Sequence, residues 1–260
     1  MRSLIILCVM LLSVSLNLRA QSTHVIEPSN LEVRYYASYE GENKKTPGLM
    51  GSNLYVFRCG KTTSQYFCYE NLRHDSLTQV PGGTKILYDE LMTWTSNPTD
   101  YSKWPTSTPG KSDFLYTDLG SGKTTIYCSL MGDHYRVTDN PTMDWKIIED
   151  STRNILGYEC QLAETDFRGR HWKAWFTLDI PLSYGPWKFR GLPGMILQAE
   201  CPGFLNIEGY KIATKGLTPI TFYNYFNFKF SDIDRVKFLK AHTPDKYPKG
   251  TLITPSMELE

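Results

Sequence analysis

The sequence lacks the short motifs that mark common catalytic and metal sites. It contains no His-Glu-x-x-His, no Cys-x-x-Cys and no Gly-x-Ser-x-Gly, so no zinc site, redox pair or serine-hydrolase elbow is indicated. Its five histidines are scattered along the chain. Acidic residues are plentiful, but nothing in their spacing selects two of them as an acid–base pair. We therefore predict no catalytic residues, no cofactor and no metal.

The sequence also has little excess of charge of one sign. Its formal net charge is +1, from 28 basic and 27 acidic residues. Loss of Arg2 and Arg19 with an N-terminal leader would lower the charge by two, to −1. Such balance gives no reason to expect nucleic acid or an anionic membrane surface as a partner.

Only one long apolar run is present, and it lies at the N-terminus. Arg2 precedes the run "LIILCVMLLSVSL", and small Ala20 stands before Gln21, a pattern typical of a secretory signal peptide. The run is too short for a transmembrane span. We predict a signal peptide over 1–20, a single domain over 21–260, and a secreted protein that is periplasmic or associated with the outer membrane. The segment "SNPTDYSKWPTSTPGKS" is expected to be an exposed loop inside that domain.

Five cysteines follow the predicted leader, an odd number that permits at most two internal disulfides. Cys59 and Cys68 lie in two aromatic segments around a Gly-Lys-Thr-Thr turn, where they could face each other across a hairpin. We predict a disulfide between them; the alternative is two buried thiols. The sequence gives no pairing for the other three, which are Cys128, Cys160 and Cys201.

The stretch "YTDLGSGKTTIYC" resembles the start of a nucleotide-binding P-loop. A P-loop needs a glycine at position 117, which is Thr117, and a helix after its Gly-Lys pair. The residues that follow, "TTIYC", favour a strand. Gly120 and Gly122 are suited to a tight hairpin, because glycine readily adopts positive φ. We predict a hairpin and no nucleotide site.

Alternating apolar residues predict strands in most of the remaining chain. They cover "LEVRYYASYE", "ILGYECQLAET", "HWKAWFTL", "MILQAE" and "FLNIEGYKIAT", with a hairpin turn around Gly169. The segment "GGTKILYDELMTWT" fits a short helix, with a strand almost as well supported. Near the C-terminus, Ser231 with Asp234 indicates a helix cap ahead of Ile233, Val236 and Leu239.

The segment "GPWKFRGLPGMILQAE" resembles the GLPGLI family, secreted proteins of Bacteroidetes named for that motif. Met195 replaces the family's leucine, and "ILGYEC", "AWFTLDIP" and Gly185-Pro186-Trp187 extend the resemblance upstream. The family implies no established activity, substrate or site residue. Its strand pairs look similar to the curved sheets of LolA-type lipoprotein carriers. We therefore predict a mainly β domain with a curved antiparallel sheet, an LolA-like half-barrel by analogy, and a short C-terminal helix.

The GLPG segment is the candidate binding or structural loop. A type II turn is expected at Leu192-Pro193-Gly194-Met195, and Gly191 would permit a close approach. As a structural element the loop would cover one end of the sheet. As a functional element it would hold an apolar ligand or contact a partner's strand. The candidate residues are Trp187, Phe189, Gly191, Leu192, Pro193 and Gly194.

Three functions remain open from the sequence. The first is a non-enzymatic ligand-binding or chaperone-like module of the envelope, with an apolar small molecule or an envelope protein as its partner. The second is a hydrolase with dispersed catalytic residues. The third is a partner subunit of an outer-membrane complex. A polar pocket, a dry apolar cavity or a long unpaired strand edge would distinguish them.

Overall fold

The structure is a computed structural model, and it describes residues 22–39, 53–96, 113–130, 132–241 and 257–259. Strands make up about half of these residues. The predicted leader, and most of the predicted loop between Ser96 and Ser112, lie outside these residues. The chain is mainly β, as predicted, and its large sheet has twelve strands.

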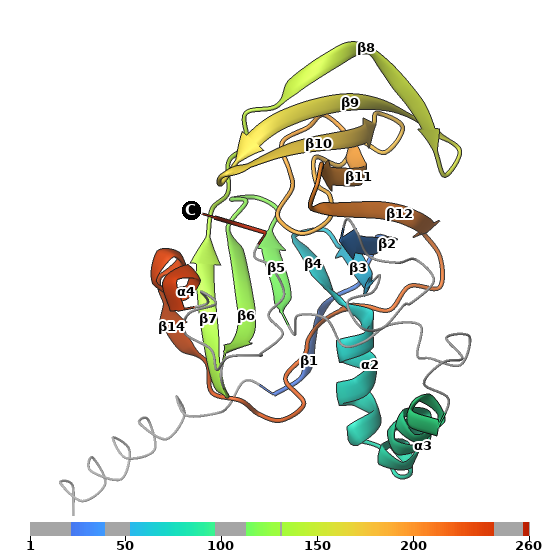
Figure 1. The fold of residues 1–260 in the computed structure, drawn as a ribbon, viewed down its shortest axis with the longest axis vertical. Coiled ribbons are helices and arrows are strands. Elements are labelled where there is room, and N and C mark those ends of the chain that lie inside the picture. The colour runs from blue at the N-terminus through green and yellow to red at the C-terminus, as the bar shows by residue number, and fades with distance from the viewer. Residues whose placement is uncertain (1–21, 40–52, 97–112, 131, 242–256, 260) are drawn as a thin grey trace, which may run out of the picture.

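Two meanders build this sheet (Figure 1). In each meander, strands that are consecutive in sequence pair antiparallel, and β2 pairs with β12 to join the two. The first meander comprises β2 (Leu31–Tyr39), β3 (Asn53–Cys59), β4 (Thr63–Cys68), β5 (Phe114–Asp118), β6 (Thr124–Leu130) and β7 (Asp133–Asp139). The second comprises β8 (Lys146–Ile155), β9 (Tyr158–Phe167), β10 (Arg170–Thr177), β11 (Met195–Cys201) and β12 (Leu205–Ala213).

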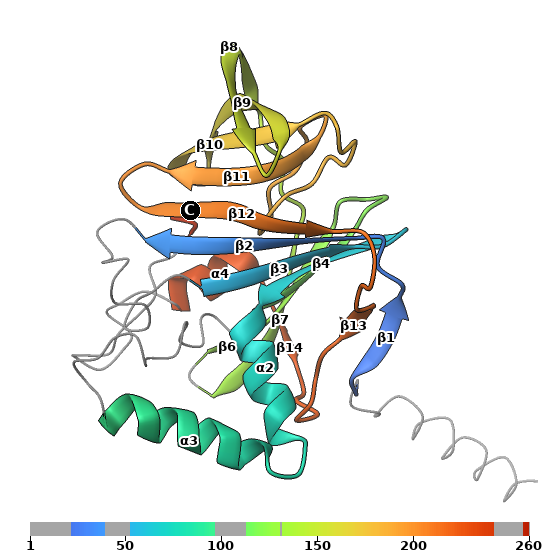
Figure 2. The same cartoon turned by 90° about the vertical axis from the view of Figure 1, so that its right-hand side faces the viewer.

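The sheet curves strongly and, among the described strands, does not close into a barrel. Its ends are β8 and the short β14 (Ser231–Ile233), which pairs parallel with β7. A separate ribbon pairs β1 (His24–Glu27) with β13 (Ile220–Phe222). Figure 2 shows β8 to β12 curving over one end of the molecule. The predicted curved antiparallel sheet is thus confirmed, with β14–β7 as its parallel exception.

Three helices accompany the sheet in the described part of the chain. Helix α2 (Tyr69–Thr78) packs against β3 and β4, and α3 (Gly83–Ser96) packs on α2. The segment that fitted either a helix or a strand is therefore the helix α3. Helix α2 was not expected, because its N-cap is Cys68, which makes no side-chain capping bond.

The short C-terminal helix is present as α4 (Arg235–Ala241), but its predicted start was partly wrong. Ser231 lies in β14, where main-chain pairing with β7 takes precedence over capping. Asp234 alone is the cap: its Oδ1 accepts hydrogen bonds from the backbone N–H of Val236 (3.0 Å) and Lys237 (3.1 Å).

The predicted turns have mixed outcomes. The Gly120–Gly122 stretch is the expected hairpin turn between β5 and β6, and Gly122 has φ +72°. Arg168 and Gly169 form the expected turn between β9 and β10. Leu156, predicted within a strand, instead forms a two-residue turn with Gly157, both with positive φ, as in a type I′ hairpin.

The predicted Cys59–Cys68 disulfide is wrong in this structure. The register of β3 and β4 places Cys59 opposite Ser64, and Cys68 opposite Tyr55, so the two sulfur atoms lie at different ends of the hairpin. Both are buried thiols outside any disulfide, as are Cys128, Cys160 and Cys201. Burial raises the pKa of the Cys59 thiol to about 11, which keeps it in the unreactive protonated form.

The main hydrophobic core lies where the curved sheet folds over itself. It contains Trp172, Ala174 and Phe176, the face of β10 that the alternation predicted, whereas Leu178 at the end of that pattern is exposed. A second, smaller cluster covers the opposite face of β3 to β5 and includes Val56 and Phe67. Because both faces of β3 and β4 are covered, most of the described residues of these two strands are buried.

Candidate functional site

The GLPG segment is an internally packed loop after β10. Phe189 is buried, and its ring packs edge-on against Trp172 with centroids 4.7 Å apart and against Trp187 at 5.2 Å. Trp145 Nε1 donates a 2.8 Å hydrogen bond to the carbonyl oxygen of Arg190. These contacts fix the loop against the main core.

Gly191 and Gly194 have roles opposite to those predicted. Gly191 has φ +96°, whereas Gly194 lies outside the positive-φ region, so the expected type II turn is not formed. A Cβ on Gly194 would lie 1.9 Å from the carbonyl oxygen of Thr177. Gly194 therefore provides the close approach, and Gly191 the unusual backbone angle. Leu192 is buried and Pro193 is exposed.

A cavity of about 100 Å³ lies on the inner face of the sheet, and we call it the tyrosine pocket. It is the second element of the candidate site. Side chains from both meanders, the GLPG loop, α4 and residues 257–258 line it. The lining comprises Ala37, Tyr39, Tyr55, Tyr66, Asp113, Leu115, Ile126, Val137, Trp187, Lys188, Leu205, Ile207, Arg235, Phe238, Leu239, Met257 and Glu258.

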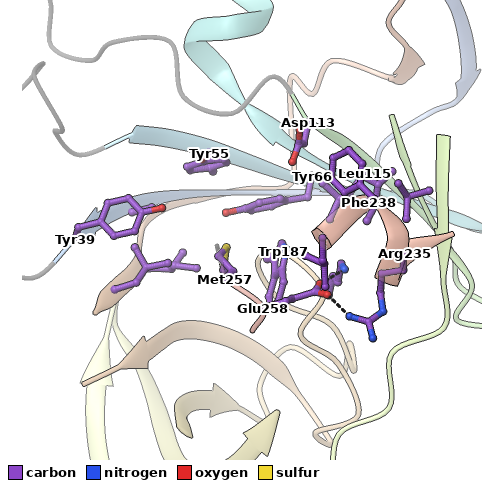
Figure 3. A pocket seen from close by; sticks show the side chains of 17 residues that line it. Tyr39, Tyr55, Tyr66, Asp113, Leu115, Trp187, Arg235, Phe238, Met257 and Glu258 are labelled. Atoms are coloured by element: carbon purple, nitrogen blue, oxygen red, sulfur yellow. Dashed lines mark hydrogen bonds and ion pairs between the residues drawn. The ribbon is translucent and has the colours of Figure 1, made fainter. Parts of the chain in front are cut away.

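Three tyrosines on adjacent strands give the pocket its character (Figure 3). Tyr39, Tyr55 and Tyr66 come from β2, β3 and β4, and the rings of Tyr55 and Tyr66 stack with centroids 5.1 Å apart and planes 3° apart. Burial raises the pKa of both stacked phenols, so they stay neutral hydroxyls at neutral pH. The pocket thus offers flat apolar surface with a few hydroxyl groups.

One wall of the pocket is charged. Glu258 accepts hydrogen bonds from Arg168 Nη1 (2.8 Å), from Arg235 Nη1 (2.7 Å) and from Lys188 Nζ. Asp139 pairs with the same Lys188 (2.9 Å) and with Arg168 (2.7 Å). No sequence motif marks these five residues, because each comes from a different part of the chain.

The pKa values of both carboxyl groups in this cluster are lowered. Burial opposes ionisation of Asp139, but the hydrogen bond from Arg168 and the charge of Lys188 outweigh it and lower the pKa to about 2. Burial likewise opposes ionisation of Glu258, and Lys188 and Arg168 again lower the pKa. Both groups are therefore carboxylates at neutral pH.

Of the six candidate loop residues, Trp187 lines the tyrosine pocket. Phe189, Leu192 and the two glycines shape the loop behind it. A binding role for Trp187 stays a prediction. Among the described residues, no group of three or more His, Cys, Asp or Glu side chains is placed to hold a metal ion. No helix in the described part of the chain is long and apolar enough to cross a membrane.

Comparison with known proteins gives one short family match and similarities to solved structures. A family described as a protein of unknown function (Porph_ging) matches residues 168–198, which include the GLPG loop and Trp187. No curated protein matches the chain. The matched segment is short, and the GLPGLI name is not confirmed by it.

The chain is similar in structure to PNGF-II, solved in the C2 and P21 space groups. Sequence identities are 13% and 14%, and TM-scores are 0.49 and 0.50. The similarity covers 81% and 82% of this chain but 32% and 33% of the solved chains. This chain therefore spans about a third of their length, and at such identity the likeness concerns the fold alone.

Proposed function

We propose that the protein is a non-enzymatic binding module that holds a small apolar or aromatic molecule in the tyrosine pocket. The observation that supports this most directly is the pocket's lining, in which aromatic and aliphatic side chains surround a few polar groups. Such composition is typical of small-molecule sites. Flat phenol rings such as Tyr55 and Tyr66 favour a planar or extended apolar body.

The pocket gives less support to the hydrolase alternative. Its described lining includes no serine, cysteine or histidine side chain, so it offers no observation in favour of a serine or cysteine hydrolase. The partner-subunit alternative would use a strand edge in place of this pocket, and the ten-residue β8 at one end of the described sheet is such an edge. Ligand binding is the function that the pocket supports best.

We also propose that the protein acts in the bacterial envelope and belongs to the GLPGLI family. The signal-peptide pattern over 1–20 supports export, and the spaced motifs around Gly191 to Ile196 support the family. A binding module exported to the periplasm or the outer membrane would meet apolar molecules there.

A neutral fluorescent probe, N-phenyl-1-naphthylamine, tests the binding proposal. Its fluorescence should rise on titration with the protein, since the pocket would shield the probe from water. Ala37→Leu should fill part of the pocket and weaken binding at least about 10-fold, equivalent to about 1.4 kcal/mol. Tyr36→Leu is the matched control, because Tyr36 is the neighbouring residue of β2 and its exposed side chain lies on the other face.

Two results would refute the proposal. One is absence of saturable probe binding to the wild-type protein. The other is equal affinity of the wild type and Ala37→Leu for the probe, when near-ultraviolet circular dichroism shows that both proteins are folded. Native mass spectrometry of the protein purified without reductant adds an independent measurement, since extra mass lost on denaturation would identify a co-purified ligand.

A further inference from the structure

Three cationic side chains converge on one point at the edge of the tyrosine pocket, and we call Arg168, Lys188 and Arg235 the cation cradle. Arg168 lies in the β9–β10 turn, Lys188 in the GLPG loop, and Arg235 begins α4. The side chain of Lys188 is 3% exposed. The cradle is thus built by three separate elements and is largely shielded from water.

The occupant of the cradle is a carboxylate from elsewhere in the chain. Both oxygens of Glu258 are used: Oε1 accepts from Lys188, and Oε2 accepts from Arg168 and Arg235. Figure 3 shows this carboxylate pointing from the pocket wall to Arg235. The geometry is that of a bound anion held by charge-assisted hydrogen bonds.

The charges of the cradle require such an occupant. Asp139 balances one of the three cations, so without Glu258 two positive charges would remain in a buried position. Burying unpaired charge is strongly unfavourable. A carboxylate from another source would therefore be attracted to the same point.

Residues 257–259, which include Glu258, are attached to the β9–β10 turn by a main-chain hydrogen bond. This bond runs from Leu259 N to the carbonyl oxygen of Arg168 (3.1 Å), and the Leu259 side chain is 63% exposed. Met257, on the other side, lines the tyrosine pocket beside Trp187. The segment thus presents an apolar group and a carboxylate side by side.

We propose that the cation cradle is a binding site for the carboxylate of an apolar organic acid, and that residues 257–259 occupy it in this structure as a built-in competitor. The acid's apolar body takes the place of Met257 in the tyrosine pocket, and its carboxylate takes the place of Glu258. This inference rests on the proposed function, because the apolar body enters the same pocket.

Chemical rescue of Glu258→Ala tests the cradle. The variant should have a lowered Tm, and benzoate should raise that Tm by about 5 °C or more at concentrations well above its Kd. Benzyl alcohol, which has the same ring without the charge, should raise it much less. Asp232→Ala is the matched control, because it removes the carboxylate partner of Arg136, and neither residue lines the tyrosine pocket. Benzoate should leave its Tm unchanged.

The result that overturns the inference is an equal effect of benzoate and benzyl alcohol on folded Glu258→Ala. Continued binding of N-phenyl-1-naphthylamine in that case would leave the proposed function standing. Loss of probe binding from the wild type would refute the proposed function, whatever benzoate does.

A measurement on the wild-type protein covers the case in which Glu258→Ala does not fold. The methyl resonance of Met257, assigned with Met257→Leu, should shift on benzoate titration as residues 257–259 leave the cradle. Benzyl alcohol should shift it less. A Met257 resonance that does not respond to benzoate would overturn the inference.

Discussion

At the residue scale, the missing Cβ of Gly194 determines how closely the GLPG loop approaches β10. Gly194→Ala would place a methyl group 1.9 Å from the carbonyl oxygen of Thr177, which is main chain and cannot rotate away. We expect the free energy of unfolding to fall by about 2–4 kcal/mol. Urea denaturation measures this loss.

Gly120→Ala is the control for that prediction. Its nearest neighbour would be Asp118 Oδ1 at 3.6 Å, an ordinary contact, and its φ is not positive. The change should alter stability by less than about 0.5 kcal/mol. Similar losses in the two variants would show that the close approach at Gly194 has no special cost.

Asp139 should make stability depend on pH in the acid range. Its folded-state pKa, about 2, lies below the ordinary value of 3.8, so its contribution is complete above about pH 5 and is lost as pH falls toward 2. The difference in unfolding free energy between the wild type and Asp139→Asn should therefore shrink by about 2 kcal/mol across that range. Urea titrations at several pH values measure it. A difference that stays constant with pH would contradict the expected pairing with Arg168 and Lys188.

The five buried thiols give a third test. In the native protein, a thiol reagent such as dithionitrobenzoate should react slowly with Cys59, Cys68, Cys128, Cys160 and Cys201, because burial protects them. After denaturation without reductant, all five should react. Fewer reactive thiols would mean that a disulfide exists, contrary to this structure.

At the element scale, α4 depends on one capping side chain. Asp234→Ala removes the acceptor for two backbone N–H groups and should cost about 1 kcal/mol. Ser231→Ala, at the residue that the sequence pattern also suggested as a cap, should leave the helix unaffected. Hydrogen exchange of the α4 amides distinguishes the two, and equal protection in both variants would refute the assignment of Asp234.

Sequence pattern predicts strands here better than helices. The strands alternate where one face lies on the core, and that period is visible in β10, where burial alternates from Trp172 to Phe176. Helix α2 has no such signal: its sequence is polar, a single residue (Asn71) is buried, and it begins at an uncapped cysteine. Helix α2 is stabilised by packing against β3 and α3. These contacts are made with other elements, so the local sequence of the helix does not predict them.

At the scale of the whole molecule, the β2–β12 pairing joins the two meanders into one sheet. Tyr35 lies at this junction: it is fully buried, and its hydroxyl donates a 2.8 Å hydrogen bond to the carbonyl oxygen of Ile196. Tyr35→Ala should lower stability by about 3 kcal/mol or more. Hydrogen exchange should accelerate equally in β4–β7 and in β9–β11, as expected of one cooperative unit. Acceleration in one meander alone would indicate two domains.

The candidate site is less predictable than the fold for a related reason. Trp187 could be selected from its aromatic loop, whereas Asp139, Arg168, Lys188, Arg235 and Glu258 look like ordinary surface charges in the sequence. Which charges become buried depends on the order of strands in the sheet and on where the turns bring them. That order is a property of the assembled molecule.

The β2–β12 junction also has a consequence for how the protein is made. Leu205 of β12 pairs with Tyr39 of β2, so the ribosome completes one partner long before the other. At about 5–20 residues per second, roughly 10–30 s separate the two. During that interval the edge of β2 that will pair with β12 has no partner strand. The nascent chain is most exposed to aggregation through that edge.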